Sequence, residues 1–357
     1  STRQPITAAL ETDMTFEGFL LFEDPPRADA RQTLTELAAA GVQVKVITGD
    51  NRHVAQAVAR AVGLPDEPVM TGPELAALRD EALWHHAQAG ALFAEIDPQQ
   101  KEHLVRALQR RGAVVGYLGD GINDAPALSA ADVGISVQGA ADVARHSADL
   151  VLTEPDLEQV MQAIQEGRRS FMNTRKYVVV TASANFGNML SMAAGGWLLP
   201  HSPMTAHQIL LNNLLSDLPA LAIAQDRVDA GPMQRPRHWD ARDLRRSLWL
   251  FGLASSAFDL LLFMLLGHGL SHSVPQFQSA WFLASLATEV VALLVLRTQG
   301  PCWQSRPAPS MLWACGAALL LGAAAVLWHP AATRLGFEPP SPQAQSMEGA
   351  GRLCQQG

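Results

Sequence analysis

Two aspartates lie four residues apart in a glycine-rich segment that could bind a metal ion beside a phosphate. Residues 118–128 read LGDGINDAPAL, and the carboxylates are those of Asp120 and Asp124. Two negative charges about 4 Å apart repel each other by roughly 4 kcal/mol at intermediate dielectric. We therefore expect a Mg²⁺ ion and a nearby lysine to balance them. The structural alternative is an Asp-Gly turn that only caps a helix. A single Asp-Gly pair would favour that alternative, whereas the complete segment favours a metal and phosphate site.

The other residues of the segment suit the same chemistry. Gly119 and Gly121 have no side chain, so the backbone here can approach a phosphate closely. Asn123 can donate a hydrogen bond without adding charge. The segment follows an apolar run that predicts a strand, and the loops after the strands carry the chemistry of a parallel α/β sheet.

The first 150 residues alternate between predicted strands and predicted helices. Strands are predicted at 16–22, 42–47, 91–95, 113–118, 133–136 and 150–152, and helices at 28–40, 52–62, 99–110 and 140–146. Such alternation is typical of a parallel sheet with helices on its faces. We therefore expect an α/β domain whose active edge is formed by the loops after its strands.

Two further loops of this domain carry groups that could bind a phosphoryl group. Thr48, Gly49 and Asp50 precede a predicted helix, whose first N–H groups attract anions. Lys101 lies near the start of another helix. A hydroxyl, a lysine and a metal-binding carboxylate can together stabilise a phosphoryl group in transfer, since that chemistry depends on positioning and charge neutralisation. Each motif alone is equally compatible with a helix start or a solvated surface residue.

The order of these motifs carries a family resemblance. TGDN, then a lysine-bearing helix, then GDGINDAPAL resembles the phosphorylation domain of P-type ATPases, a branch of the haloacid dehalogenase fold. The resemblance implies that Thr48, Gly49 and Asp50 contact the phosphoryl region. It implies that Lys101 neutralises the charge of that region.

The same resemblance assigns roles in the glycine-rich segment. Asp120 and Asp124 would hold the catalytic Mg²⁺, and Asn123 would complete the shell around phosphate and metal. The fold class expected for residues 16–168 is a haloacid dehalogenase-like α/β domain with a Rossmann-like parallel sheet. Residues 1–15 resemble the end of the nucleotide-binding region of these pumps, whose ATP is bound mainly by parts absent from this chain.

The second half of the chain is more apolar than the first. The 357 residues are 48% hydrophobic and 17% charged, with a net charge of −8, which argues against nucleic acid as a partner. Five stretches approach the roughly 20 residues that cross a bilayer. They are 178–199, 206–224, 248–267, 280–296 and 311–328. Five such stretches in succession predict an all-α transmembrane domain over residues 169–330 and a lipid bilayer around it.

Basic residues predict how this domain is oriented. Arg and Lys precede the first stretch and occur between the second and third and between the fourth and fifth, whereas 200–205 and 268–278 have none. Because loops that stay in the cytoplasm are enriched in Lys and Arg, we expect the α/β domain to face the cytoplasm. The family resemblance implies a bacterial inner (plasma) membrane. The first residues do not read as a signal peptide. The three cysteines form no metal-binding pattern.

Polar residues within the apolar stretches indicate a cation path. Asn185 and Asn188 lie about one helical turn apart, an arrangement that could also serve only to hold helices together. Asp217 lies inside an apolar helix, at an insertion cost of roughly 2.5 to 3.5 kcal/mol, and is a functional candidate by default. Pro219 cannot donate to the carbonyl of Leu215, so we expect the helix to kink or open and expose backbone oxygens. Such oxygen ligands suit a hard cation and disfavour copper or zinc.

The segments SANFGN and LLNNLLSDLPALAIAQDRVD resemble the magnesium-transporting branch of P-type ATPases. The resemblance implies that Asn185, Asn188, Asn213 and Asp217 line the transport site. Calcium pumps typically carry a carboxylate at the position of Asn188, so the site here would be less negative. Asp259 and Glu289 also lie in apolar stretches, where a structural role and ion contact are equally compatible with the sequence.

The Asp-Lys-Thr-Gly phosphorylation motif of the family is absent, since none of the three lysines follows an aspartate. We expect the phosphorylated aspartate, the actuator domain and the first membrane helices to lie upstream, so this chain alone would not form the phosphoenzyme. Residues 337–357 are rich in Pro, Gln, Ser and Gly, and we expect a disordered tail over residues 331–357.

The sequence therefore predicts the C-terminal part of a P-type ATPase that couples ATP hydrolysis to Mg²⁺ transport, in the import direction of the resembled branch. The missing N-terminal part of the pump and the transported cation are the expected partners. A catalytically silent membrane regulator of the same fold, a pump for another hard cation such as Ca²⁺, and an independent phosphatase are the alternatives.

Overall fold

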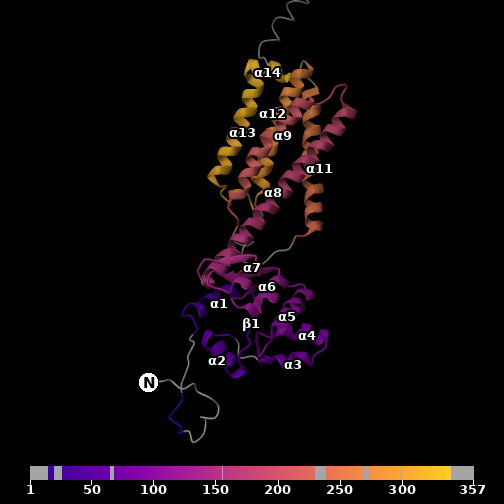
Figure 1. Cartoon of the computed structure of the whole chain (residues 1–357). Coiled ribbons are helices and arrows are strands. Elements are labelled where there is room, and N and C mark those ends of the chain that lie inside the picture. Colours follow the sequence, from indigo (N-terminus) through magenta and orange to yellow (C-terminus); the bar gives the residue numbers. More distant parts are fainter. Residues whose placement is uncertain are drawn as a thin grey trace, which may run out of the picture. The chain divides into compact units, whose positions relative to one another are not determined.

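A computed structural model describes residues 15–19, 26–64, 68–154, 156–229, 239–267, 273–298 and 300–338. The chain divides into two compact units, Ser1–Gln159 and Val160–Gly357. The strands lie in the first unit, and the second unit consists of helices (Figure 1).

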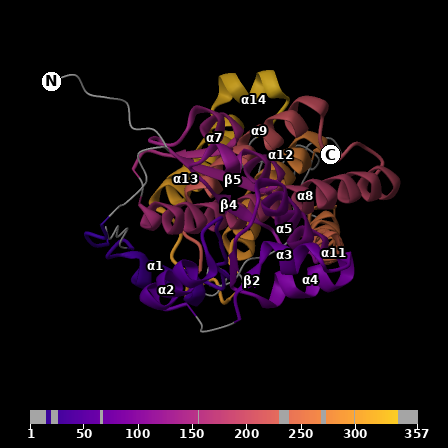
Figure 2. The same cartoon turned by 60° about the horizontal axis from the view of Figure 1, so that its bottom comes forward.

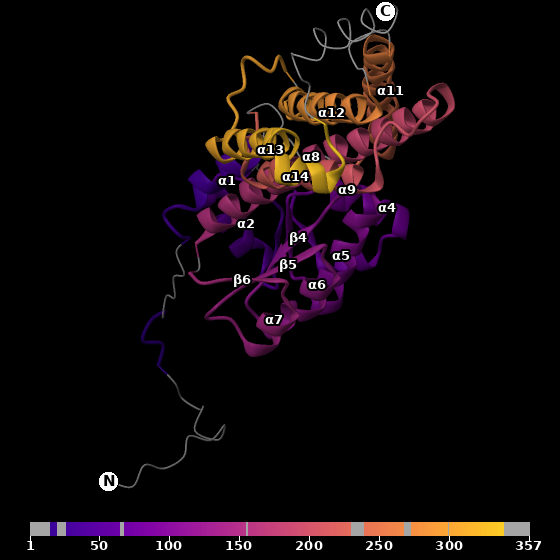
Figure 3. The same cartoon turned by 90° about the horizontal axis from the view of Figure 1, so that it is seen from above.

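Six parallel strands form two small sheets in the first unit. One sheet has the order β1 (Val46–Ile47), β3 (Leu92–Ala94), β2 (Met70–Thr71), and the other has the order β4 (Gly116–Leu118), β5 (Val133–Val137), β6 (Leu150–Leu152). In the second sheet Leu118 is opposite Ile135, and the three strands run side by side (Figure 3). The parallel α/β prediction is confirmed.

The predicted strands differ from the observed ones mainly at their starts. The paired residues begin at Val46 and Gly116, later than predicted, because only the ends of these apolar runs have a hydrogen-bonding neighbour. Residues 15–19 form no strand, and the rest of the predicted strand 16–22 lies outside the described residues. The two-residue strand β2 was too short for its alternation to be recognised.

The helices of the first unit are short. They are α1 (Ala30–Ala39), α2 (Arg52–Val62), α3 (Gly72–Ala76), α4 (Asp80–Ala89), α5 (Pro98–Arg110), the 3₁₀ turn η2 (Ile122–Asp124), α6 (Ala125–Ala130) and α7 (Asp142–Ser147). Asn51 caps α2 by accepting from the backbone N–H of His53, and Gly63 ends it with φ of 83°. α1 packs against α2, and α4 packs against α5 (Figure 2).

Helix α5 connects the cores of the two sheets. Its Leu104 is buried with Phe93 of β3, and its Val105 is buried with Tyr117 of β4. Ile47 of β1 packs against both clusters. Because consecutive residues of α5 bury into different clusters, this helix fixes the loops after β1, β3 and β4 relative to one another.

The second unit consists of long helices that run beside one another (Figure 1). They are α8 (Leu157–Leu198), α9 (Ala206–Leu221), the 3₁₀ turn η3 (Ala222–Gln225), α11 (Ala241–Leu265), α12 (Val274–Leu296), α13 (Pro309–Leu327) and α14 (His329–Leu335). In the described part of the chain, α11, α12 and α13 are long and apolar enough to cross a membrane. The predicted span 178–199 corresponds to the C-terminal half of α8, and the predicted span 206–224 corresponds to α9 and most of η3. Since α9 has only 16 residues, the five-span interpretation stays a prediction.

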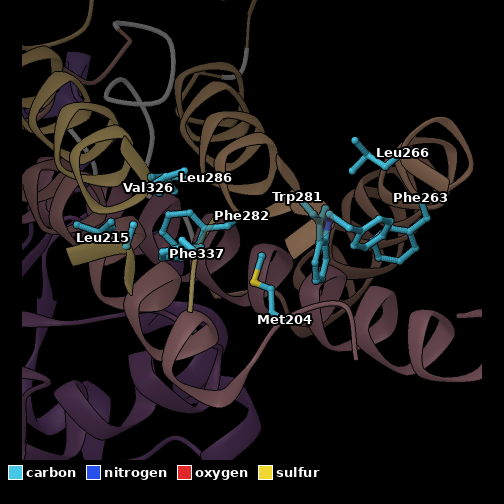
Figure 4. Close-up of a cluster of buried hydrophobic side chains, with 11 residues drawn as sticks. Met204, Leu215, Phe263, Leu266, Trp281, Phe282, Leu286, Val326 and Phe337 are labelled. Atoms are coloured by element: carbon cyan, nitrogen blue, oxygen red, sulfur yellow. The ribbon is translucent and has the colours of Figure 1, made fainter. Parts of the chain in front are cut away.

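Aromatic side chains fill the core of this unit. Trp281, Phe282 and Phe337 are among its buried residues (Figure 4). The ring of Phe337 lies 4.8 Å from that of Phe282, centroid to centroid. The predicted disordered tail is therefore wrong at its start, because residues 331–335 belong to α14 and Phe337 anchors the chain in the core. The remainder, 339–357, lies outside the described residues.

Candidate functional site

The glycine-rich segment forms a tight turn between β4 and α6, built around a buried carboxylate. Asp124 lies at the end of η2, where its Oδ1 accepts from Lys101 Nζ at 2.7 Å and from the Tyr117 hydroxyl at 2.9 Å. Its Oδ2 accepts from the backbone N–H of Gly121 at 3.1 Å. Both oxygens of this carboxylate are thus bound by the protein.

Electrostatics favour the ionised form of Asp124. Burial alone would raise the pKa of this carboxyl. The hydrogen bonds from Lys101, Tyr117 and the Gly121 backbone together lower the pKa by more than burial raises it, so the pKa lies below its ordinary value. The pKa of Tyr117 is raised, first by burial and then by the charge of Asp124. Tyr117 therefore serves as a neutral donor here.

Gly119 is required because Asp124 packs directly against it. A β-carbon at residue 119 would lie 2.6 Å from the β-carbon of Asp124. Real β-carbons do not approach so closely, so a larger residue would displace the carboxylate. Gly121 is less crowded, with its nearest contact to Asp124 at 3.2 Å.

Asp120 differs from Asp124 in being exposed at the end of β4. Its backbone carbonyl accepts from Ala141 N–H at 3.0 Å, which ties the turn to the start of α7. Within the described residues, no hydrogen bond to its carboxylate is recorded. An exposed carboxylate beside an exposed Asn123 has the oxygen chemistry that Mg²⁺ prefers, although the described residues contain no group of three acidic, His or Cys side chains around it.

The TGD turn after β1 closes on itself through its side chains. Thr48 Oγ1 donates to Asp50 Oδ2 at 2.8 Å and accepts from the Asp50 N–H at 3.1 Å. The backbone of this turn also accepts hydrogen bonds from the loop after β3. The Ile96 N–H donates to the Thr48 carbonyl, and the Glu95 N–H donates to the Asp50 carbonyl. Gly49 is exposed at the tip of the turn.

The loop that binds the TGD turn also leads into the helix of Lys101. This loop ends at Asp97, which caps α5 by accepting from Gln100 N–H at 2.8 Å. Lys101 lies in the first turn of α5 and is only 12% exposed in its side chain. The contacts run from Thr48 through residues 95–97 to Lys101 and Asp124, which brings the three predicted loops to one edge of the unit.

Sequence reasoning did not single out Glu95 or Tyr117. Glu95 has φ of 57°, a region that non-glycine residues rarely adopt, and its Oε1 accepts from Arg52 N–H at 3.2 Å. It thus satisfies one N–H at the start of α2. Tyr117 was assigned only to a strand, and no sequence signal marks its hydroxyl as a partner of Asp124.

In the helical unit, Glu289 is the centre of a buried polar cluster. Its Oε1 accepts from Asn188 at 2.7 Å, from Asn212 at 2.9 Å and from Ser285 at 3.4 Å. Among the described residues, Glu289 Oε2 and Asn212 Oδ1 are buried without a partner. Unpaired buried oxygens are costly, so this cluster has unused capacity for a cation.

The four predicted transport residues line two adjacent cavities. Asn185, Asp217 and Glu289 line a cavity of about 30 Å³ together with Ser216. Asn188, Asn213 and again Asn185 line a second cavity of about 620 Å³. Asn212, which the sequence interpretation passed over, contacts Glu289 directly.

Asp217 and Pro219 lie near the end of α9. Asp217 is exposed on its helix, whereas Pro219 is buried. The α-helix continues two residues past the proline to Leu221 and then tightens into η3. Asp259 does not contact Glu289; it accepts from Ser191 and Trp281.

Two family comparisons match separate parts of the chain. Residues 2–132 match the family described as haloacid dehalogenase-like hydrolase. Residues 201–346 match the family described as cation transporting ATPase, C-terminus. The change from the α/β unit to the helical unit, after Gln159, lies between the two matched ranges.

Curated relatives give a consistent result. The chain is 43% identical over 303 residues to the magnesium-transporting ATPase, P-type 1 of Salmonella typhimurium (strain LT2), covering 84% of this chain and 34% of that protein. It is 42% identical over 293 residues to its namesake in Escherichia coli (strain K12), covering 81% and 33%. It is 37% identical over 229 residues to calcium-transporting ATPase 1 of Yarrowia lipolytica, covering 62% and 25%. The chain spans about a third of the length of the magnesium-transporting relatives.

Proposed function

The chain belongs to the P-type cation-transporting ATPases, and we propose that it supplies the phosphorylation site and the ion path of a pump that couples ATP hydrolysis to Mg²⁺ import. The contact between Lys101 and Asp124 beside the exposed Asp120 carries this proposal. A lysine whose ammonium group is held by Asp124, and an exposed carboxylate four residues before Asp124, together support a site for a phosphoryl group and a metal ion.

The phosphoryl site divides its tasks among few residues. Asp120, with Asn123, holds the Mg²⁺, which when bound neutralises charge on the phosphoryl oxygens. Lys101 contributes a second positive charge, and Asp124 orients it. Thr48 and the exposed backbone of Gly49 bind the remaining phosphoryl oxygens. Asp124 thereby acts on the lysine, and we do not assign it as a second metal ligand because both its oxygens already accept hydrogen bonds from the protein.

The acceptor aspartate comes from a part of the pump outside this chain. Among the described residues, β1 pairs only with β3 and β4 pairs only with β5. On their open edges, β1 ends at Ile47, just before Thr48, and β4 ends at Leu118, two residues before Asp120. Ile47 packs against the clusters of both sheets. A strand added between these edges would deliver a carboxylate to the site. Because the acceptor aspartate would come from elsewhere in the pump, the chain alone would form no phosphoenzyme.

The transported ion passes between α8, α9 and α12. Glu289 and Asp217 supply negative charge, and the amides of Asn185, Asn188, Asn212 and Asn213 supply neutral oxygens. Such a set suits a hard cation that keeps part of its water shell. The basic residues around the helix ends support a cytoplasmic position of the α/β unit at the inner membrane.

Growth rescue tests both sites. The full-length gene is expressed in a bacterial strain that requires high external Mg²⁺, in parallel with Asp120→Asn, Asp217→Asn and the control Asp243→Asn on α11. We expect the control to rescue growth at low Mg²⁺ and the other two variants to fail. Phosphoenzyme formation from ATP separates the defects, because Asp120→Asn abolishes turnover at the phosphoryl site and Asp217→Asn impairs the ion site. Undiminished rescue by Asp217→Asn would contradict the assigned ion path.

Calcium is the second candidate cargo, because a calcium-transporting ATPase also aligns with this chain. Uptake of Mg²⁺ and Ca²⁺ by the full-length pump in vesicles decides between them. A silent membrane regulator of the same fold is the remaining alternative. An in-frame Asp-Lys-Thr-Gly upstream of Ser1 in the gene would contradict the regulator.

A further inference from the structure

Asp259 is a buried carboxylate that joins three helices. It lies on α11 and is 2% exposed. Its Oδ2 accepts from the Ser191 hydroxyl of α8 at 2.7 Å, and its Oδ1 accepts from the Trp281 indole N–H of α12 at 3.2 Å. A carboxylate in an apolar bundle is costly, which favours a specific role for it.

Both donors lie about one helical turn from the polar cluster at Glu289. Ser191 follows Asn188 by three residues on α8, and Trp281 precedes Ser285 by four residues on α12. Residues three or four apart lie on the same helix face. Asn188 and Ser285 are the residues of these helices that donate to Glu289. A single carboxylate thus holds α8 and α12 one turn away from their contacts with Glu289.

Trp281 also forms part of the cavity beside the cluster. This cavity of about 620 Å³ is lined by Trp281 together with Asn188, Asn212 and Ser285. The ring of Phe263 packs against the indole in a T-shaped arrangement, with the ring centroids 4.8 Å apart (Figure 4). Without Asp259 the indole N–H would be a buried donor with no acceptor recorded among the described residues, so the ring would have to turn.

We propose that Asp259 is a positioning residue of the ion path, which holds Trp281 in the cavity wall and sets the distance between Asn188 and Glu289. Asp259 lines neither cavity at Glu289, and both its oxygens are bound, so it acts through its two donors. This inference rests on the proposed transport site. It adds a residue for which charge is unimportant and hydrogen-bond geometry is essential.

The test compares three variants of the full-length pump by the external Mg²⁺ concentration that gives half-maximal uptake. Asp259→Asn retains an acceptor for Trp281, Asp259→Leu removes it, and Trp281→Phe removes the donor while keeping an aromatic ring in the cavity wall. Trp313→Phe, an exposed tryptophan on α13, is the matched control. We expect Asp259→Leu and Trp281→Phe to raise the half-maximal concentration about tenfold at nearly unchanged maximal rate, as outer-shell changes do at metal sites. Asp259→Asn and Trp313→Phe should stay near the wild type.

Each other outcome has a defined meaning. If Asp259→Asn is as impaired as Asp259→Leu, the charge itself is required and the positioning role is wrong. If Trp281→Phe has the half-maximal concentration of the wild type, the bond has no influence on the ion site and the inference is overturned, even where Asp259→Leu fails to fold. Glu289→Gln in the same assay keeps the two proposals separate. If it impairs uptake while the Asp259 and Trp281 variants do not, only the positioning role fails.

Discussion

The ammonium nitrogen of Lys101 lies 2.7 Å from Oδ1 of Asp124, so the lysine expected at the phosphoryl group is held by the second carboxylate of the glycine-rich segment. Both side chains are 12% exposed. The hydrogen bond to Asp124 holds the charge of this lysine at a fixed position. Little rotational freedom therefore remains to be lost when an anion binds. This pre-organisation is the property that phosphoryl transfer requires.

Replacing this lysine should destabilise the α/β unit. Lys101→Met leaves the buried Asp124 without its cation, although Tyr117 and Gly121 still donate to it, and we expect a loss of about 1 to 3 kcal/mol. Arg106→Met, which breaks an exposed pair on the same helix, should cost less than about 1 kcal/mol. Hydrogen–deuterium exchange of peptides from α5 and β4 in the full chain would measure the difference. Equal protection in the two variants would contradict a stabilising pair.

The Asp124 carboxyl should also make stability depend on pH. Its pKa in the folded state lies below the ordinary value of 3.8, so its contribution is fully present above pH 3.8 and is lost as the pH falls through the folded pKa. Asp124→Asn has no such carboxyl. We expect the wild type to lose stability more steeply than this variant below pH 3.8, and the two to run parallel above it, in urea unfolding followed by exchange of β4.

Gly134 should tolerate no side chain. A β-carbon at this position in β5 would lie 2.6 Å from the carbonyl oxygen of Leu128, and a backbone atom cannot move away as a flexible side chain can. We expect Gly134→Ala to cost about 1 to 3 kcal/mol. Gly139→Ala is the control, since nothing lies within 4 Å of its β-carbon. Thermal unfolding of both variants would check the prediction, and equal melting temperatures would refute it.

Glu289 should be required for ion transport in its charged form. Glu289→Gln keeps an oxygen acceptor for Asn188 and Asn212 but removes the charge that faces the cation. We expect the half-maximal Mg²⁺ concentration for uptake to rise about tenfold or more. Glu166→Gln, at an exposed acid near the start of α8, should behave as the wild type. An unchanged value for Glu289→Gln would assign this residue a structural role only.

Asp226 should hold the helix ends of the second unit together. Its buried carboxylate accepts from Lys176 on α8 at 3.1 Å, from Arg297 after α12 at 3.3 Å and from Ala308 N–H before α13 at 3.1 Å. Removing its charge leaves two buried cations without a counterion, so we expect Asp226→Asn to cost about 3 kcal/mol. The exposed Asp243→Asn should cost less than about 1 kcal/mol. Melting temperatures of the detergent-solubilised protein would separate the two, and similar values would contradict the role.

The sequence alone determined the features that depend on local order along the chain. Helix α2 has the predicted bounds 52–62, because Asn51 and Gly63 are start and stop signals that act within one turn. The parallel sheets followed from the alternation of elements, and the family followed from motifs whose order is itself a sequence property. The apolar stretches were visible because a bilayer requires length and composition, both of which are linear quantities.

Tertiary structure decided which side chains meet. Lys101 and Asp124 are 23 residues apart, and Asn188 and Glu289 are 101 residues apart, so no periodicity could pair them. The sequence treated Glu289 and Asp259 alike, whereas their neighbours place one carboxylate at the cavities and the other behind them. The polar residues that follow Phe337 predict a disordered tail that includes it. Only its packing against Phe282 in the folded chain fixes its position. Distances between separate helices are set by the core that fills the space between them, and that core exists only once the chain has folded.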